Sequence, residues 1–180
     1  MKCLRCILCF VFLGCSLWVP VGGLYSSEEN HFEAELPTGW SRTYYAVDGI
    51  TMTRDGFPLQ IVQITRSPFD KVQPFTNRRL EKGMLPLEAA EVVIDNLKSN
   101  PNIRNFHVVE NQPAMVGGYP GFKILYSFDT KEHLNKQGVY FGALVDQWLY
   151  RILLEAPARH YFSRDLADIE RLKASFKITL

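Results

Sequence analysis

Three side chains near the carboxyl end of the sequence could act together in acid–base or anion chemistry. Arg151, Glu155 and His160 supply a cation, a carboxylate and an imidazole within one short segment. Such a set suits a small pocket in an envelope enzyme or in a small-ligand-binding protein. Ion pairs that hold the beginning of a helix account for the same residues, and this is the interpretation we favour.

The remaining titratable residues show no catalytic or metal-binding spacing. The four histidines are scattered along the chain, and all four cysteines lie in the first fifteen residues. The sequence also lacks the nucleophile-elbow serine, the phosphate-binding glycine loop and the dinucleotide fingerprint. We therefore predict a protein that is not an enzyme and has no catalytic residue, no metal and no cofactor.

The connection over residues 67–85 is the most informative segment outside the predicted strands and helices. It is long for a compact domain, and connections of this length are usually functional or flexible. Two prolines disfavour a regular helix there. Its basic side chains are Lys71, Arg78, Arg79 and Lys82. A mobile basic loop without a partner is one interpretation. The other is a docking surface for an acidic envelope protein or for lipid headgroups.

The amino-terminal segment has the layout of an export signal. Lys2 and Arg5 precede a short apolar run that ends at Cys15. We therefore predict a targeting segment over residues 1–23 and a protein that is exported, either to the periplasm or to the envelope side of a membrane. The membrane is then a predicted partner through this signal or through a lipid anchor.

Three outcomes are open for the targeting segment. Phe12-Leu13-Gly14-Cys15 resembles a bacterial lipoprotein box, which would make Cys15 the site of lipid attachment. Val21-Gly22-Gly23 offers small residues to an ordinary signal peptidase. An uncleaved anchor reaching Leu24 is the third outcome, because the apolar stretch approaches the roughly 20 residues that span a bilayer.

The rest of the chain alternates between polar and apolar residues in the manner of a sheet with two helices. Asp55-Gly56 predicts a hairpin turn, as does the glycine-rich segment 117–121. Strand 59–66 is apolar on both faces and is predicted to be buried on both sides. The predicted strands cover residues 32–36, 43–47, 50–54, 59–66, 105–111, 114–116, 122–128, 139–145 and 148–155.

Two amphipathic helices complete the pattern. The first begins at Pro86 and carries an apolar stripe of Leu87, Ala90, Ile94 and Leu97. The second begins near Ser163, with Asp165 placed favourably near the positive end of the helix dipole. Its stripe is Leu166, Ile169 and Leu172. These helices predict an α+β fold, an α/β/α sandwich with a largely antiparallel central sheet, in one domain over residues 24–180.

Several landmarks together resemble the PsbP family of exported domains, which includes extrinsic subunits of the photosynthetic oxygen-evolving complex and bacterial lipoproteins of undefined role. The resemblance implies an α/β/α sandwich and a noncatalytic role beside membranes. It does not imply photosynthesis, and no residue match carries over a metal or chloride site. The resembling segments are residues 32–40, Gly117-Gly118-Tyr119-Pro120-Gly121-Phe122, Trp148-Leu149-Tyr150 and Ser175-Phe176-Lys177.

The charge balance argues against a nucleic-acid partner. The whole chain carries a formal charge of +1, and Lys2 and Arg5 belong to the predicted targeting segment. The domain is therefore close to neutral, without the excess of basic residues that binding to phosphate backbones requires. The function that we predict is a noncatalytic binding or assembly module, tethered at or near a membrane of the cell envelope.

We predict that the mature protein lacks 14 to 23 amino-terminal residues, because the basic region and the apolar run form an export signal. Intact-mass analysis of native protein measures this directly. If Cys15 is lipidated, Cys15→Ser should release the protein from membranes. A mature mass that still includes residues 1–14 would exclude both cleavage sites and leave the uncleaved anchor.

Overall fold

One antiparallel sheet forms the centre of the structure. The computed structural model describes residues 18–43, 48–57 and 59–180. Each described strand pairs only with antiparallel neighbours. The strands are β1 (Trp18–Ser27), β2 (Phe32–Thr43), β3 (Gly49–Thr53), β4 (Ile61–Pro68), β5 (Ile103–Val116), β6 (Tyr119–Thr130), β7 (Asn135–Val145), β8 (Trp148–Pro157) and β9 (Lys177–Ile178).

The sheet joins two meanders at its middle. The strand order is β1-β2-β3-β4-β8-β7-β6-β5, with the short β9 paired to β2. The first four strands follow one another in sequence, and so do β5 to β8 in the opposite direction. The junction is the β4–β8 pair, in which Ile64 lies opposite Ile152. The chain crosses from β4 to β5 through the long connection and α1 (Pro86–Lys98).

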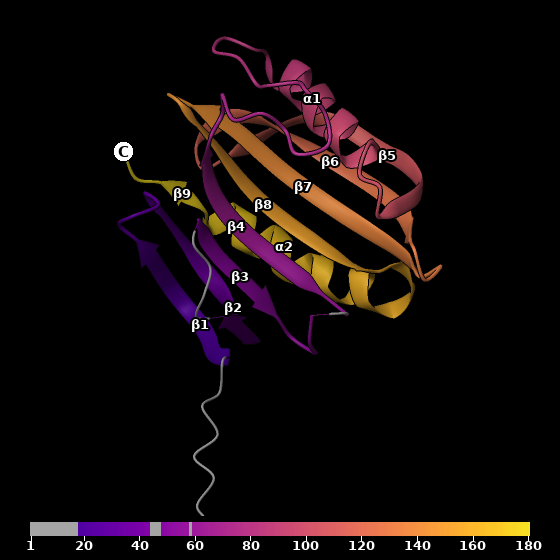
Figure 1. Ribbon diagram of the computed structural model, residues 1–180. Coiled ribbons are helices and arrows are strands. Elements are labelled where there is room, and N and C mark those ends of the chain that lie inside the picture. The colour runs from indigo at the N-terminus through magenta and orange to yellow at the C-terminus, as the bar shows by residue number, and fades with distance from the viewer. Residues whose placement is uncertain (1–17, 44–47, 58) are drawn as a thin grey trace, which may run out of the picture.

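The two helices cover opposite faces of the sheet, which confirms the predicted α/β/α arrangement (Figure 1). Helix α1 contacts β5, β6 and β7, whereas α2 (Ser163–Ser175) contacts β2 and β8. A short π-helical turn, η1 (Ala158–Phe162), leads from β8 into α2.

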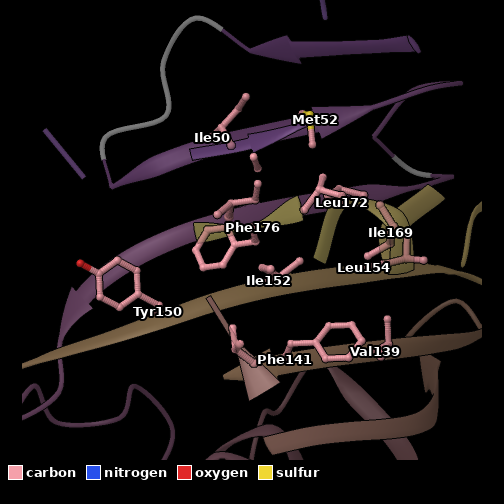
Figure 2. Packing of buried hydrophobic residues seen from close by; sticks show 14 of the residues in the cluster. Ile50, Met52, Val139, Phe141, Tyr150, Ile152, Leu154, Ile169, Leu172 and Phe176 are labelled. Atoms are coloured by element: carbon pink, nitrogen blue, oxygen red, sulfur yellow. The ribbon is translucent and has the colours of Figure 1, made fainter. Parts of the chain in front are cut away.

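The face beneath α2 is a continuous apolar core. Ile169 and Leu172 of α2 pack against alternate residues of the central strands, including Ile152 and Phe141 (Figure 2). Phe176 follows the helix directly and is 3% exposed, with its ring centroid 5.5 Å from that of Phe32. The aromatic residue at the end of the last helix therefore closes the core where the two ends of the domain meet.

The face beneath α1 has a second core. Phe122, Ile124, Tyr126 and Phe128 alternate along β6 and are all buried there, as their spacing predicts. The helix buries Ala90 and Ile94 as predicted, and Leu97 packs partly buried on the same core. Leu87 is 41% exposed, however, and Ala89, Val92 and Val93 are buried as well. The prediction for Leu87 was wrong because this residue lies at the side of the buried stripe, which is centred on Ala89, Ala90 and Val93.

Strand β4 differs from the prediction in its burial. Val62 and Ile64 are fully buried on the α2 side, but Ile61, Gln63 and Thr65 on the other side are only half-buried. Helix α1 contacts β5 to β7 and does not reach this part of the sheet. The strands buried on both faces are β7 and β8.

Strand β2 is longer than predicted. Pro37-Thr38-Gly39 was expected to end the strand, but β2 continues to Thr43 and pairs with β1 on both sides of a register shift between Val21 and Gly23. A bulge of this kind lets an irregular segment stay within a sheet. The second predicted strand, over residues 43–47, lies outside the described residues apart from Thr43.

Strand β1 begins within the segment assigned above to targeting. Residues 18–23 pair with β2, with Trp18 opposite Thr43 and Val21 opposite Trp40. The predicted domain boundary near residue 24 therefore falls inside a strand. Cys15 lies outside the described residues.

The turn predicted at Asp55-Gly56 is part of a longer loop, over residues 54–60, that is held by a buried carboxylate. Asp165 of α2 has no exposed surface. Its Oδ1 accepts hydrogen bonds from Arg54 Nη1 and Arg164 Nε at 2.8 Å each, and its Oδ2 accepts one from Gln60 Nε2 at 2.9 Å. Arg54 and Gln60, at the two ends of this loop, thus both contact α2 through one carboxylate.

Trp40 joins the same network from β2. Its Nε1 donates to Asp168 Oδ2 at 3.2 Å, and the same oxygen accepts from Arg54 Nη2 at 2.9 Å. The indole is 1% exposed. A buried indole N–H with a partner is the usual arrangement for tryptophan in a core.

We expect Asp165→Ala to destabilise the fold by about 3 kcal/mol, because it breaks a buried charged pair and removes the acceptor of Arg54 Nη1 and Arg164 Nε. Urea unfolding of the variant and of the wild type measures the difference. The control is Asp70→Ala, which removes an exposed carboxylate and should change the free energy of unfolding by no more than about 0.5 kcal/mol. A loss below about 1 kcal/mol for Asp165→Ala would show that the network is not structural.

Candidate functional site

A cavity lies on the α1 side of the sheet, where α1 no longer covers the strands. It has a volume of about 310 Å³. Its floor comes from β4, β7 and β8, and its roof comes from residues 71–74 of the connection together with Asn96 of α1. We call it the Arg151 cavity. Its polar lining includes Thr65, Ser67, Lys71, Asn96, Tyr140 and Arg151.

Arg151 is the half-buried cation of this cavity. It lies opposite Thr65 in the β4–β8 pair, and its Nη2 donates to Gln63 Oε1 at 3.0 Å. Its Nε is buried and has no hydrogen-bond partner among the described residues. Within that part of the chain, no carboxylate oxygen lies within 4 Å of the guanidinium. Arg151 therefore contributes a positive charge that no neighbouring carboxylate neutralises directly.

Tyr140 contributes an aromatic wall beside this cation. It is 4% exposed, and its ring centroid is 6.0 Å from the Arg151 guanidinium carbon. Burial raises the pKa of the Tyr140 phenol, while the positive charge of Arg151 partly opposes that shift. The phenol therefore stays protonated at neutral pH and can donate a hydrogen bond.

Glu155 lies on the same face of β8 as Arg151 but has a different partner. Its Oε1 accepts a hydrogen bond of 2.6 Å from the Tyr126 hydroxyl. Burial raises the pKa of Tyr126 well above its usual value, and the negative charge of Glu155 adds to the shift. Glu155 thus satisfies a buried phenol beneath α1.

The three residues first considered for chemistry do not form one site. Arg151 lines the cavity, whereas neither Glu155 nor His160 does. His160 is exposed in η1, and its ring packs edge-on against Tyr161 at 5.2 Å between centroids. The structure thus gives no common pocket to the expected trio. The ion pairs expected at the beginning of the helix do occur there, but they involve Arg164 with Asp55 and Asp165.

The connection is fastened to the domain at several points. Strand β4 ends at Pro68, so the part without helix or strand covers residues 69–85, which we call the basic connection. Leu80 is 1% exposed and belongs to the core beneath α1. The backbone N–H of Phe75 donates to Asn96 Oδ1 at 2.9 Å, and Arg78 forms an ion pair with Asp95. Its path over α1 is therefore fixed by contacts at Phe75, Arg78 and Leu80.

The four basic residues of this segment have different surroundings. Arg78 is engaged by Asp95. Lys71, Arg79 and Lys82 are exposed, and among the described residues none of the three has a carboxylate within 4 Å. Lys71 also reaches the Arg151 cavity. Three of the four predicted partner-binding residues are thus exposed without an ion pair to a described residue.

The described residues offer no metal centre and no membrane-spanning helix. Across residues 18–43, 48–57 and 59–180, no group of three or more histidine, cysteine, aspartate or glutamate side chains could hold a metal ion. In the same ranges, no helix is both long and apolar enough to cross a bilayer.

Sequence reasoning missed the Arg151 cavity because its parts come from distant segments. Tyr140 and Asn96 were assigned only to a strand and a helix. The signal for Tyr140 was an aromatic residue with a polar tip on a face that is otherwise buried. Nothing in the local sequence indicates that Asn96 meets the connection, since that contact depends on how the chain returns over α1.

Comparisons with solved structures show the fold. The solution structure of cyanobacterial PsbP from Synechocystis matches with a TM-score of 0.61 over 92% of this chain and 98% of that one, at 13% identity. The crystal structure of the Ran-binding protein Mog1p from Saccharomyces cerevisiae matches with a TM-score of 0.56 over 89% and 96%, at 9% identity. No family model and no curated protein matches the sequence. The resemblance to PsbP is therefore confirmed as a likeness of fold.

We expect stability to fall with pH above about 10, because unfolded tyrosine ionises there while the buried phenols keep their protons. A group whose pKa is raised in the folded state stabilises the fold below its unfolded pKa and loses that contribution as pH rises. Each such phenol should add up to about 1.4 kcal/mol per pH unit to the decline.

The measurement is urea unfolding at several alkaline pH values, with the ultraviolet absorbance of phenolate followed in parallel. Tyr140→Phe removes one ionising group and should make the decline shallower. A decline of the same slope in this variant would show that Tyr140 ionises as readily in the folded protein as in the unfolded chain.

Proposed function

We propose that this protein is a noncatalytic binding or assembly module of the cell envelope, held at or near a membrane. The observation that carries the proposal is the basic connection. It displays Lys71, Arg79 and Lys82 without ion pairs to described residues, on a segment whose path is fixed by Leu80 and Asn96. A preorganised surface loses less entropy on binding than a mobile loop does.

A noncatalytic role agrees with the chemistry of the described residues. The expected trio of Arg151, Glu155 and His160 is dispersed, and Glu155 is engaged by a buried phenol. Mog1p, which has a similar fold, is described as a Ran-binding protein, so this architecture serves at least one binding function. Fold alone does not determine function, so the comparison supports the proposal without fixing the partner.

The pairing of β1 favours one form of membrane attachment. Cleavage after Gly23 would remove residues 18–23, which pair with β2, and would leave the backbone of β2 beside Trp40 without its neighbour. An uncleaved helical anchor over residues 6–24 would compete with the same strand, because residues 18–24 cannot be in both. Cleavage before Cys15 leaves β1 whole, so we favour a lipid anchor on Cys15, followed by only a few residues before the domain.

The partner that we propose for the basic connection is an acidic surface of another envelope protein. Arg79 and Lys82 do not line the Arg151 cavity, so they test docking separately from it. We expect Arg79→Ser combined with Lys82→Ser to fold as stably as the wild type, since exposed substitutions change the free energy of unfolding by about 0.5 kcal/mol or less. Capture of the partner from solubilised envelope should fall several-fold and weaken with salt, because exposed charges are screened beyond roughly 10 Å at 0.1 M.

The matched control is Lys131→Ser combined with Lys177→Ser, which removes two exposed lysines elsewhere on the domain. It should capture the partner as the wild type does. Equal capture by the Arg79 and Lys82 variant would exclude these residues from docking. Loss of binding to phosphatidylglycerol vesicles with unchanged protein capture would assign the surface to lipid instead.

A further inference from the structure

The Arg151 cavity combines features that neither the fold nor the docking surface requires. It is about 310 Å³, at the lower end of the range of small-molecule sites. It is lined by Arg151, whose buried Nε has no partner in the described part of the chain. The Tyr140 hydroxyl likewise forms no hydrogen bond within the described residues. Arg151 and Tyr140 thus both line the cavity with donors that no other described residue uses, and an acceptor that enters it can receive hydrogen bonds from both.

The charge of the lining defines the kind of acceptor. Arg151 and Lys71 contribute two cations, and Asp48 at the margin contributes one carboxylate. The lining is therefore positive by one charge, which suits a monoanion better than a phosphate dianion. A guanidinium N–H and a phenol O–H are both donors, and a carboxylate offers two oxygens to receive them.

The rest of the lining defines the body of the ligand. Pro68, Val72, Pro74 and Leu149 contribute apolar surface, and Tyr140 adds an aromatic wall. A ligand that was charged throughout would leave these walls uncovered. The apolar surface and the positive end together match a small molecule with one carboxylate and an apolar body.

We propose that the Arg151 cavity binds a small monocarboxylate whose carboxylate meets Arg151 and Tyr140 and whose apolar body lies beneath residues 71–74 of the basic connection. Arg151 orients the carboxylate because its guanidinium is held by Gln63 Oε1 at 3.0 Å. Lys71, at the exposed side, adds long-range attraction without a fixed contact. This site is separate from the docking surface formed by Arg79 and Lys82.

The test uses benzoate, with benzamide as a neutral ligand of the same shape. Both are titrated into the isotope-labelled protein, and backbone amide shifts are followed by NMR. Benzoate should shift the amides of Thr65, Asn96 and Leu149, and benzamide should bind at least about tenfold more weakly, because a hydrogen bond to a charged group is worth at least that factor. Equal binding of the two ligands, or no shift of these amides with benzoate, would overturn the proposal.

Variants of the lining residues test which side chains contact the carboxylate of the ligand. Arg151→Gln should weaken benzoate binding at least about tenfold, whereas Arg159→Gln, which removes an exposed arginine outside the cavity, should not change it. If Arg151→Gln does not fold, Tyr140→Phe tests the same contact and should weaken binding several-fold. Unchanged benzoate binding in whichever of these two variants folds would overturn the assignment of the carboxylate to Arg151 and Tyr140. Equal shifts with inorganic phosphate would show a site that selects charge alone, which would also exclude a carboxylate site.

Discussion

The carboxylate of Asp165 holds together parts of the chain that are far apart in sequence. It is fully buried, and it is reached by Arg54 and Gln60 from the loop between β3 and β4 and by Arg164 from its own helix. A buried charge is tolerated only when donors surround it, so this loop and α2 have to assemble together. Asp168, one turn further along α2, extends the network to Trp40 of β2. The first meander is thereby fixed to the helix that also packs on β8, and the sheet can be continuous across the β4–β8 junction.

The two helices cover the two faces of the sheet to different extents. Helix α2 crosses its face of the sheet where the two meanders join, and a large apolar core lies there beside the buried carboxylate of Asp165. On the other side α1 covers only β5 to β7, so Gln63, Thr65 and Arg151 on β4 and β8 remain half-buried. Apolar residues at these positions would be exposed to water, which explains why the same face changes from aromatic on β6 to polar on β4. The cavity is the part of this polar region that the basic connection covers.

The sequence was sufficient to predict the strands and helices whose hydrophobic periodicity is strong. The alternation along β6 and the stripe Ile169 and Leu172 in α2 placed those side chains correctly, and the two helices on opposite faces followed from them. Three features were not predictable from local patterns. Leu87 was wrongly expected to be buried because it lies at the side of the apolar stripe of α1, and the sequence does not show how far burial extends around the helix. Asp165 was read as a dipole partner because its donors Arg54 and Gln60 lie more than a hundred residues earlier. For the candidate site, Arg151 and the connection were both singled out, but their meeting in one cavity depends on the path of the chain between β4 and α1.

The basic connection has one side toward the domain and another toward solvent. The side chains on the first hold the segment in place, and those on the second do not. Toward the domain, Leu80 fills the core beneath α1 and residues 71–74 cover the cavity. Toward solvent, Arg79 and Lys82 carry no ion pair to a described residue, so they are not needed to hold the segment in place. Arg78 is exposed but also holds the segment, because its ion pair with Asp95 joins the connection to α1. Its charge is therefore partly neutralised. A segment built in this way can change its outward charges without losing its path. Leu80 and the hydrogen bond from the Phe75 N–H to Asn96 are the contacts that hold it against the domain beside the cavity.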